Sequence, residues 1–145
     1  MAIAERTADC TWKGDLAHGE GTVSGSSGAL SDLEVTWASR TGRSAGKTSP
    51  EELVAAAHAS CFSMALAHEL AQAGNPPEQL EVSAHVTLDQ QGDAPTVTTS
   101  ELTVTGHVPG IDQEAFTKAA TGAGRNCPIS RALAGVEISV RATLA

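Results

Sequence analysis

The sequence predicts a single α+β domain over residues 1–145, with antiparallel sheets, a long central helix and a second, shorter helix. Three observations predict this class. The first third is rich in Gly, Ser and Thr, one long run is apolar between helix-start and helix-stop signals, and the second half alternates apolar with polar residues. One-sided alternation is typical of antiparallel strands with a solvated face. A length of 145 residues fits one domain.

The N-terminal third is expected to form three short strands. They are placed at residues 8–12, 21–24 and 33–39, and a Ser-Ser-Gly turn signal at 26–28 precedes the third.

The long helix has the clearest signals. Ser49 is the expected N-cap, Pro50 the first helical residue, and Glu52 the capping-box carboxylate. The apolar run reaches Leu70, and Gly74 with the prolines after it ends the helix. Because apolar residues occupy nearly every side, we expect protein to surround this helix, in a core or in a dimer interface.

The second half is expected to contain three strands and a helix. The first two strands flank a turn at residues 91–93, and a bulge is expected near 99–100. Asp112 is the expected N-cap of the second helix, and a further helical turn begins at residues 127–128. The alternating apolar residues are Leu80, Val82, Ala84, Val86 and Leu88, then Leu102, Val104, Gly106 and Val108, and finally Val136, Ile138, Val140, Ala142 and Leu144.

Charge and composition argue against several classes of partner. The formal net charge is −8, which opposes binding to nucleic acids and to anionic membranes. No run approaches the roughly 20 apolar residues of a membrane span, and the first ten residues lack the apolar block of a secretory signal. We therefore expect a cytoplasmic protein. No zinc-binding cluster and no phosphate-binding loop is present, so no cofactor is expected.

Three cysteines could carry chemistry in a reducing compartment. Cys61 lies about three turns into the long helix, beyond the reach of the helix dipole, and needs a cation from elsewhere to become a thiolate. Otherwise it is a small core residue. Cys127 precedes a proline at a helix start, with Arg125 and Arg131 nearby, and all of these favour a thiolate. Cys10 is interpreted as structural.

The long helix carries two further candidates. Glu52 is explained by helix capping, whereas Glu51 is free for another role. His58 precedes Cys61 by three residues, so the two side chains can share a helix face. They could form the nucleophile pair of a Cys–His hydrolase, or His58 could be a buried histidine bonded to a neighbouring carbonyl.

Several segments resemble one known family. The segment at 49–66, SPEELVAAAHASCFSMAL, is similar to the central helix of the OsmC/Ohr family of osmotically inducible and organic-hydroperoxide-resistance peroxidases. The segment NCPIS at 126–130 resembles the second cysteine motif of this family. Segments at 12–16, 19–24 and 108–112 also resemble the OsmC branch, so the similarity runs along the whole chain in order.

The resemblance implies an intertwined homodimer that acts as a two-cysteine organic hydroperoxide reductase without metal, haem or flavin. By position, Cys61 is the peroxidatic cysteine and Cys127 the resolving one, which forms an intramolecular disulfide with the Cys61 sulfenic acid. A dithiol, such as a lipoylated protein, then reduces the disulfide. Arg40 matches the arginine that stabilises the thiolate, and Glu51 matches the glutamate that orients this arginine.

Two alternatives stay open for the arginine, since the Ohr branch takes it from an earlier loop: Arg43 and Arg6. Glu51 and Cys61 are ten residues apart in one helix, or about 15 Å along its axis. We therefore expect a composite site with Cys61 from one subunit and Arg40 from the other. A competing hypothesis is a non-catalytic module that binds an apolar ligand on the same fold.

Overall fold

The computed structural model describes all residues 1–145, which form two compact units, Met1–Leu53 (unit 1) and Val54–Ala145 (unit 2). The boundary falls in the first turn of the long helix. The predicted α+β class is confirmed, and all strand pairs except one are antiparallel as predicted. That residues 1–145 form one domain stays a prediction.

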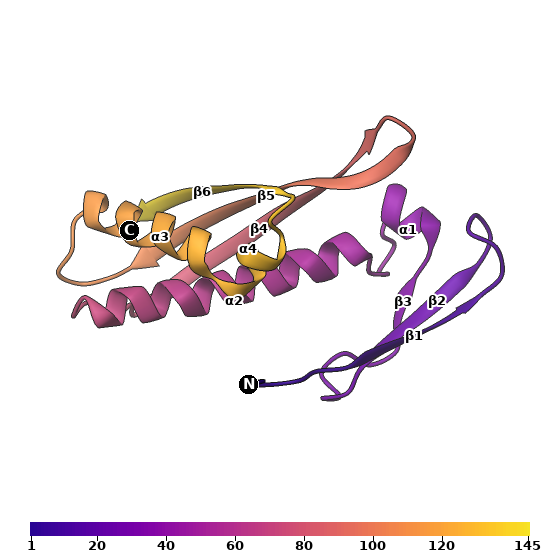
Figure 1. The fold of residues 1–145 in the computed structure, drawn as a ribbon, viewed down its shortest axis with the longest axis horizontal. Helices are drawn as coiled ribbons and strands as arrows, with labels where there is room; N and C mark the ends of the chain where they lie inside the picture. The colour runs from indigo at the N-terminus through magenta and orange to yellow at the C-terminus, as the bar shows by residue number, and fades with distance from the viewer. The chain divides into compact units, whose positions relative to one another are not determined.

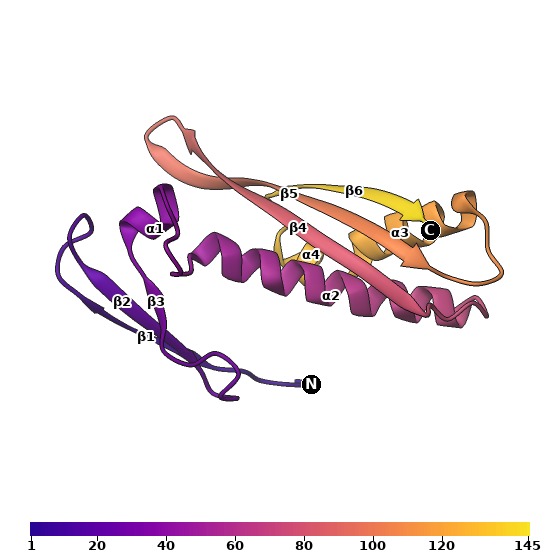
Figure 2. The same cartoon turned by 180° about the vertical axis from the view of Figure 1, so that it is seen from behind.

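Unit 1 contains a small antiparallel sheet and one short helix. Its sheet has the order β1-β2-β3, and Figure 2 shows the three strands from behind. The predicted strands at 8–12 and 21–24 are observed. The elements of unit 1 are β1 (Ala8–Lys13), β2 (Glu20–Gly25), β3 (Leu33–Val35) and α1 (Trp37–Thr41).

The predicted strand at 33–39 is wrong beyond Val35, where α1 replaces it. Thr36 caps this helix, because its hydroxyl accepts a hydrogen bond from the Ser39 N–H over 3.0 Å. The Ser39 hydroxyl lies 2.9 Å from the Thr36 N–H, which completes a capping box. These local bonds satisfy the free N–H groups of a helix start and outweigh the strand preference of this segment.

Unit 2 contains the long helix, a second sheet and two further helices. The predicted N-caps are observed, since the Glu52 N–H donates to the Ser49 hydroxyl over 3.1 Å and the Ala115 N–H donates to Asp112 over 2.8 Å. The predicted capping-box role of Glu52 is wrong, because its carboxylate accepts from the Thr48 hydroxyl over 2.7 Å instead of from the Ser49 N–H. Its elements, with the first turn of α2 shared with unit 1, are α2 (Pro50–Gln72), β4 (Gln79–Gln91), β5 (Ala94–His107), α3 (Gln113–Asn126), α4 (Pro128–Ala132) and β6 (Glu137–Leu144).

The sheet of unit 2 is mixed, with the order β4-β5-β6. Strands β4 and β5 form an antiparallel hairpin, whereas β6 runs parallel to β5. The antiparallel direction expected for β6 is wrong, because its alternation indicates one solvated face and is compatible with the parallel direction as well. The crossover through α3 and α4 permits it, because parallel neighbours need a connection that returns the chain to the same end of the sheet. The expected bulge lies at Thr98, since Leu88 pairs with Val97 and Thr87 with Thr99.

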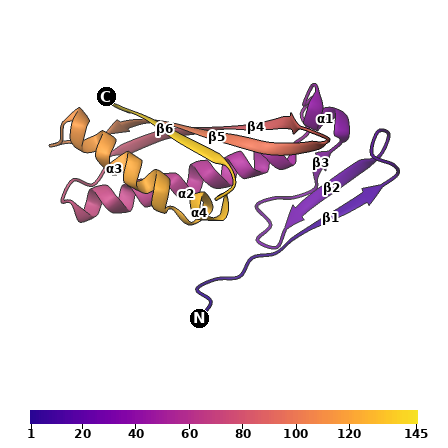
Figure 3. The same cartoon turned by 45° about the horizontal axis from the view of Figure 1, so that its top comes forward.

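Helices α2 and α3 both lie on one face of this sheet (Figures 1 and 3). The buried residues between the layers include the predicted stripe of β5 and the α3 residue Phe116. Gly106 is required here, because a Cβ atom at this position would lie 2.4 Å from the Phe116 ring. The buried core is Phe62, Leu66, Leu70, Leu102, Val104, Val108, Phe116, Ala120, Ala123 and Cys127.

Helix α2 keeps an uncovered apolar side within the chain. Contrary to the expectation from the sequence, this helix is long and apolar enough to cross a membrane by length and composition, and only 22 % of its most apolar 18 residues are buried. Met64 is 68 % exposed. The expectation that protein surrounds this helix is therefore not met by its own chain.

Candidate active site

Unit 1 brings Arg40 and Glu51 together in a bidentate ion pair. Arg40 lies in α1, and Glu51 is buried in the first turn of α2. Arg40 Nη2 lies 2.7 Å from Glu51 Oε1, and Nε lies 3.0 and 3.1 Å from the two carboxylate oxygens. This two-point contact holds the guanidinium plane in one orientation.

The other two candidate arginines lie elsewhere. Arg6 is exposed and donates to the Glu5 carbonyl over 2.7 Å. Arg43 is exposed and forms no ion pair. Of the three arginines considered, only Arg40 has a carboxylate partner.

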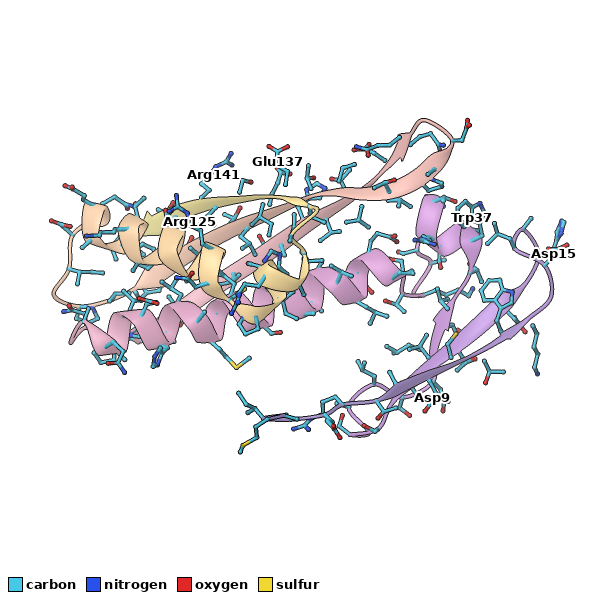
Figure 4. The ribbon with its side chains drawn as sticks, in the orientation of Figure 1. Asp9, Asp15, Trp37, Arg125, Glu137 and Arg141 are labelled. Carbon is cyan, nitrogen blue, oxygen red and sulfur yellow. The ribbon has the colours of Figure 1, made fainter.

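An apolar cavity of about 310 Å³ lies in unit 1 beside Arg40. The Trp37 ring, which Figure 4 labels on α1, forms part of its wall, and its centroid lies 5.8 Å from Arg40 Cζ. Such a cation–π contact steadies the guanidinium further. Cys10, predicted to be structural, is exposed on β1 and also lines this cavity. The lining residues are Cys10, Trp12, Leu16, Val23, Val35, Thr36, Trp37, Arg40, Pro50 and Leu53.

Unit 2 brings Cys61 and Cys127 together. Both are free thiols; Cys61 is half-buried on α2 and Cys127 is fully buried. Burial raises the pKa of the Cys61 thiol, the Ile129 N–H partly opposes this change, and the neighbouring Cys127 raises the pKa further. No cation contributes within this unit, so activation of Cys61 requires a positive charge from outside it.

Cys127 occupies the predicted position at a helix start, as the N-cap of α4. Its sulfur accepts a hydrogen bond from the Ser130 N–H over 3.3 Å and lies 3.0 Å from the Ser130 hydroxyl. Arg125 and Arg131 are exposed and form no hydrogen bond to Cys127; Figure 4 labels Arg125 on α3. The effect of these arginines on the thiol therefore stays a prediction.

His58 is fully buried and bonded to two serine hydroxyls. Its Nδ1 lies 2.7 Å from Ser100 Oγ, and its Nε2 lies 2.8 Å from Ser130 Oγ. Both expected partners, Cys61 and a backbone carbonyl, are wrong. Burial lowers the pKa of His58, so the ring is neutral at pH 7.

Sequence analysis did not single out the two serines. Ser100 continues the buried face of Leu102 and Val104 on β5, which marked it as an inward-facing polar residue. Ser130 had no comparable signal, since serine is common in the first turn of a helix.

The fold and these groups define a class of protein. Two neighbouring free thiols can be oxidised to a disulfide, and a guanidinium oriented by a carboxylate can stabilise an anion. These are the parts of a redox protein that uses thiol chemistry.

The comparisons with known proteins identify its family. Residues 42–141 match the OsmC-like protein family. The chain is 40 % identical over 122 residues to peroxiredoxin OsmC of Escherichia coli (strain K12), covering 84 % of this chain and 85 % of that protein. The same values hold for peroxiredoxin OsmC of Shigella flexneri. The chain therefore belongs to the OsmC-like family.

Solved structures support the same fold. The organic hydroperoxide resistance protein OhrB of Bacillus subtilis has a TM-score of 0.71 and 26 % identity, covering 96 % of this chain and 98 % of that one. The organic hydroperoxide resistance protein OsmC of Legionella pneumophila has a TM-score of 0.74 at 23 % identity, covering 99 % of both chains. The protein is thus a peroxidase-type oxidoreductase with an antioxidant role in oxidative stress, and its fold is that of a soluble protein.

Proposed function

We propose that this protein reduces organic hydroperoxides to alcohols with Cys61 as the peroxidatic cysteine and Cys127 as the resolving cysteine. The observation that carries the proposal is the contact of the two free thiols in unit 2, where Cys127 acts on the pKa of Cys61. A half-buried thiol next to a second thiol can be oxidised and then captured before further oxidation.

The first step is attack of the Cys61 thiolate on the distal peroxide oxygen. The O–O bond breaks, the alkoxide leaves and takes a proton to become the alcohol, and Cys61 becomes a sulfenic acid. The Arg40 guanidinium stabilises the thiolate and the charge that develops on the oxygens. Glu51 holds this guanidinium in place through its bidentate contact.

The second step is capture of the sulfenic acid by Cys127. The S–S bond forms, the S–O bond breaks, and water leaves. An external dithiol, of the lipoyl type, then reduces the disulfide by thiol exchange. We expect these steps to take place in the cytoplasm, with no nucleic acid or membrane as partner, consistent with the net charge of −8.

A homodimer with composite sites supplies the missing cation. Cys61 and Cys127 of one subunit would meet Arg40 and Glu51 of the other. The uncovered apolar side of α2 supports such a dimer, because a second copy would bury it. The helix also separates Glu51 from Cys61 by about 15 Å along its axis.

The apolar cavity beside Arg40 supports an organic substrate. A cavity of about 310 Å³ lined by Trp and aliphatic side chains would take the alkyl part of a hydroperoxide, with the peroxide group toward the guanidinium. The same cavity favours the second candidate function, a non-catalytic module that binds an apolar ligand.

One experiment separates the two functions. The reduced protein is mixed with an alkyl hydroperoxide and a lipoyl-type dithiol, and peroxide consumption is measured with a dimedone trap for sulfenic acid. We expect turnover that the Cys61→Ser variant lacks, with the trapped sulfenic acid located on Cys61 by mass spectrometry. Ser139→Ala, at an exposed serine on β6, is the control and should retain activity. No turnover, together with a Cys61 thiol that resists alkylation in the native protein, would favour the binding module.

A further inference from the structure

A continuous chain of hydrogen bonds links the buried histidine of unit 2 to the resolving thiol. It runs from Ser100 Oγ to His58 Nδ1 over 2.7 Å and from His58 Nε2 to Ser130 Oγ over 2.8 Å. It ends with a contact of 3.0 Å from Ser130 Oγ to Cys127 Sγ. All four side chains are buried, and no buried side-chain nitrogen or oxygen lacks a partner.

This network joins three elements that the chain brings together only on folding. His58 comes from α2, Ser100 from β5, and Ser130 with Cys127 from the start of α4. No charged side chain hydrogen-bonds to His58, Ser100 or Ser130. Any proton that leaves Cys127 through this network must therefore end on the imidazole.

The single N–H of a neutral imidazole decides which atoms of the network donate and which accept. A neutral imidazole has one N–H donor and one acceptor nitrogen. When Nδ1 donates to Ser100, Nε2 accepts from the Ser130 hydroxyl, whose oxygen then accepts from the Cys127 S–H. After the thiol loses its proton, the Ser130 O–H and N–H can both donate to the sulfur. The same contacts thus suit the thiol and the thiolate.

We propose that Ser130 and His58 form a proton relay that deprotonates Cys127 as it attacks the Cys61 sulfenic acid. This inference rests on the proposed function, in which Cys127 is the resolving cysteine. Ser130 contacts the reacting sulfur, whereas His58 acts through Ser130 and is a positioning residue.

With this relay, every proton and electron in the disulfide-forming step is accounted for. The Cys127 proton passes to Ser130 Oγ as the Ser130 hydroxyl proton passes to His58 Nε2. The thiolate of Cys127 then forms the S–S bond, and hydroxide leaves Cys61 as the S–O bond breaks. The imidazolium returns its proton, and the hydroxide becomes water. The Cys127 sulfur is oxidised and the Cys61 sulfur is reduced, so no further oxidant or reductant is needed.

The first test follows a single turnover of the full chain carrying Cys10→Ser. One equivalent of cumene hydroperoxide is added, and sulfenic acid formation and disulfide formation are timed separately. For Ser130→Ala we expect disulfide formation to slow by more than about tenfold, while sulfenic acid forms at a rate within about twofold of the parent and accumulates. Ser130→Thr keeps the hydroxyl and should restore the rate. Ser139→Ala, at an exposed serine on β6, is the matched control.

His58→Gln separates a relay from a purely structural role. The glutamine amide can hydrogen-bond to the serine hydroxyls but cannot take up a proton. We expect about the same free energy of unfolding as the parent and a rate of disulfide formation lower by more than about tenfold. A parental rate in this variant would overturn the relay.

A second measurement keeps the relay testable without peroxide. In the chain with Cys10→Ser and Cys61→Ser, Cys127 is alkylated with iodoacetamide. We expect Ser130→Ala and His58→Gln each to slow this reaction by about tenfold, since the proton acceptor is lost. Alkylation rates in both variants equal to that of the parent would reject the relay. Absence of sulfenic acid at Cys61 in the parent would instead reject the proposed function, and the alkylation rates would still decide about the relay.

Discussion

Unit 1 and unit 2 differ in how they hold their functional groups. In unit 1 the groups are charged, and the Arg40–Glu51 pair lies next to an apolar cavity. In unit 2 the groups are two thiols and an imidazole packed against a core, where burial raises the pKa of Cys61 and lowers that of His58. The comparison teaches that the proposed function needs both units, because unit 2 holds the two neighbouring thiols and unit 1 holds the Arg40–Glu51 pair.

The largest expected effect concerns the core that only unit 2 contains. Phe62, next to Cys61, is fully buried. We expect Phe62→Ala to lower the free energy of unfolding by about 3–5 kcal/mol, since it leaves a cavity. Val23→Ala, at a half-buried position in the sheet of unit 1, should cost about 1 kcal/mol. Urea unfolding followed by circular dichroism measures both, and equal losses would contradict this difference between the units.

The second prediction tests whether charge and thiol come from different subunits. Arg40→Met should lower kcat/KM by about 10²–10³-fold, because it removes the group that stabilises the thiolate and the transition state. Peroxide consumption measures the loss.

Mixed dimers then decide where the arginine acts. When Arg40→Met and Cys61→Ser subunits are unfolded, mixed equally and refolded, half of the dimers are mixed and one of their two sites is intact. We expect about a quarter of wild-type activity to return. No recovery, with mixed dimers present by native mass spectrometry, would place the arginine and the thiol of one site in the same subunit.

The third prediction concerns the uncovered side of α2. Met64 is 68 % exposed within its chain, and a second copy would bury it. Met64→Asp should weaken the dimer by about 2 kcal/mol, because it places a charge in an apolar interface. Analytical ultracentrifugation over a dilution series measures this change. Asp89→Asn, at an exposed position on β4, is the control, and an unchanged assembly for Met64→Asp would remove this helix side from the interface.

The fourth prediction compares two adjacent carboxylates. Glu51 binds Arg40 through both oxygens, whereas Glu52 accepts from the Thr48 hydroxyl over 2.7 Å and is exposed. Glu51→Gln should lower kcat/KM about tenfold, since the guanidinium loses its bidentate partner. Glu52→Gln should leave kcat/KM within about twofold. Steady-state kinetics with one hydroperoxide measures both, and equal effects would argue against a special role for Glu51.

The smallest effect is the pH dependence of stability that comes from His58. Burial lowers the pKa of this imidazole, so the unfolded chain binds its proton at a higher pH than the folded chain does. Its contribution to stability is therefore full above about pH 6.5 and is lost as the pH falls through the lowered pKa of the folded state. Urea midpoints at pH 7.5 and 5.0 should differ more for the wild type than for His58→Gln. The same difference in both proteins would contradict this assignment.

Local patterns predicted the elements and their caps well. The Ser49 and Asp112 caps and the inward face of β5 follow from side chains close in sequence, and the structure shows all of them. The strand predicted over 33–39 is wrong from Thr36 onward, because Thr36 and Ser39 form a capping box that starts a helix. The resemblance to the OsmC/Ohr family indicated the family and the fold.

The contacts of the candidate sites were harder to predict. His58 bonds to serines that lie 42 and 72 residues further along the chain. Arg125 and Arg131 are near Cys127 in sequence, but their side chains are exposed. Sequence proximity therefore did not indicate that Ser130 is the hydrogen-bond partner of Cys127, because the direction of a side chain depends on how its helix packs.

By itself, the sequence determined α2, α3 and α4, most strands, the alternation of the second sheet and membership of the family. These properties depend on periodicity and on caps, which act over a few residues. Only the tertiary structure decided that β6 runs parallel to β5, that Cys61 lies beside Cys127, and that Ser130 connects His58 to Cys127. Such contacts arise when distant segments pack around one core, and no short-range pattern encodes which side chains meet there.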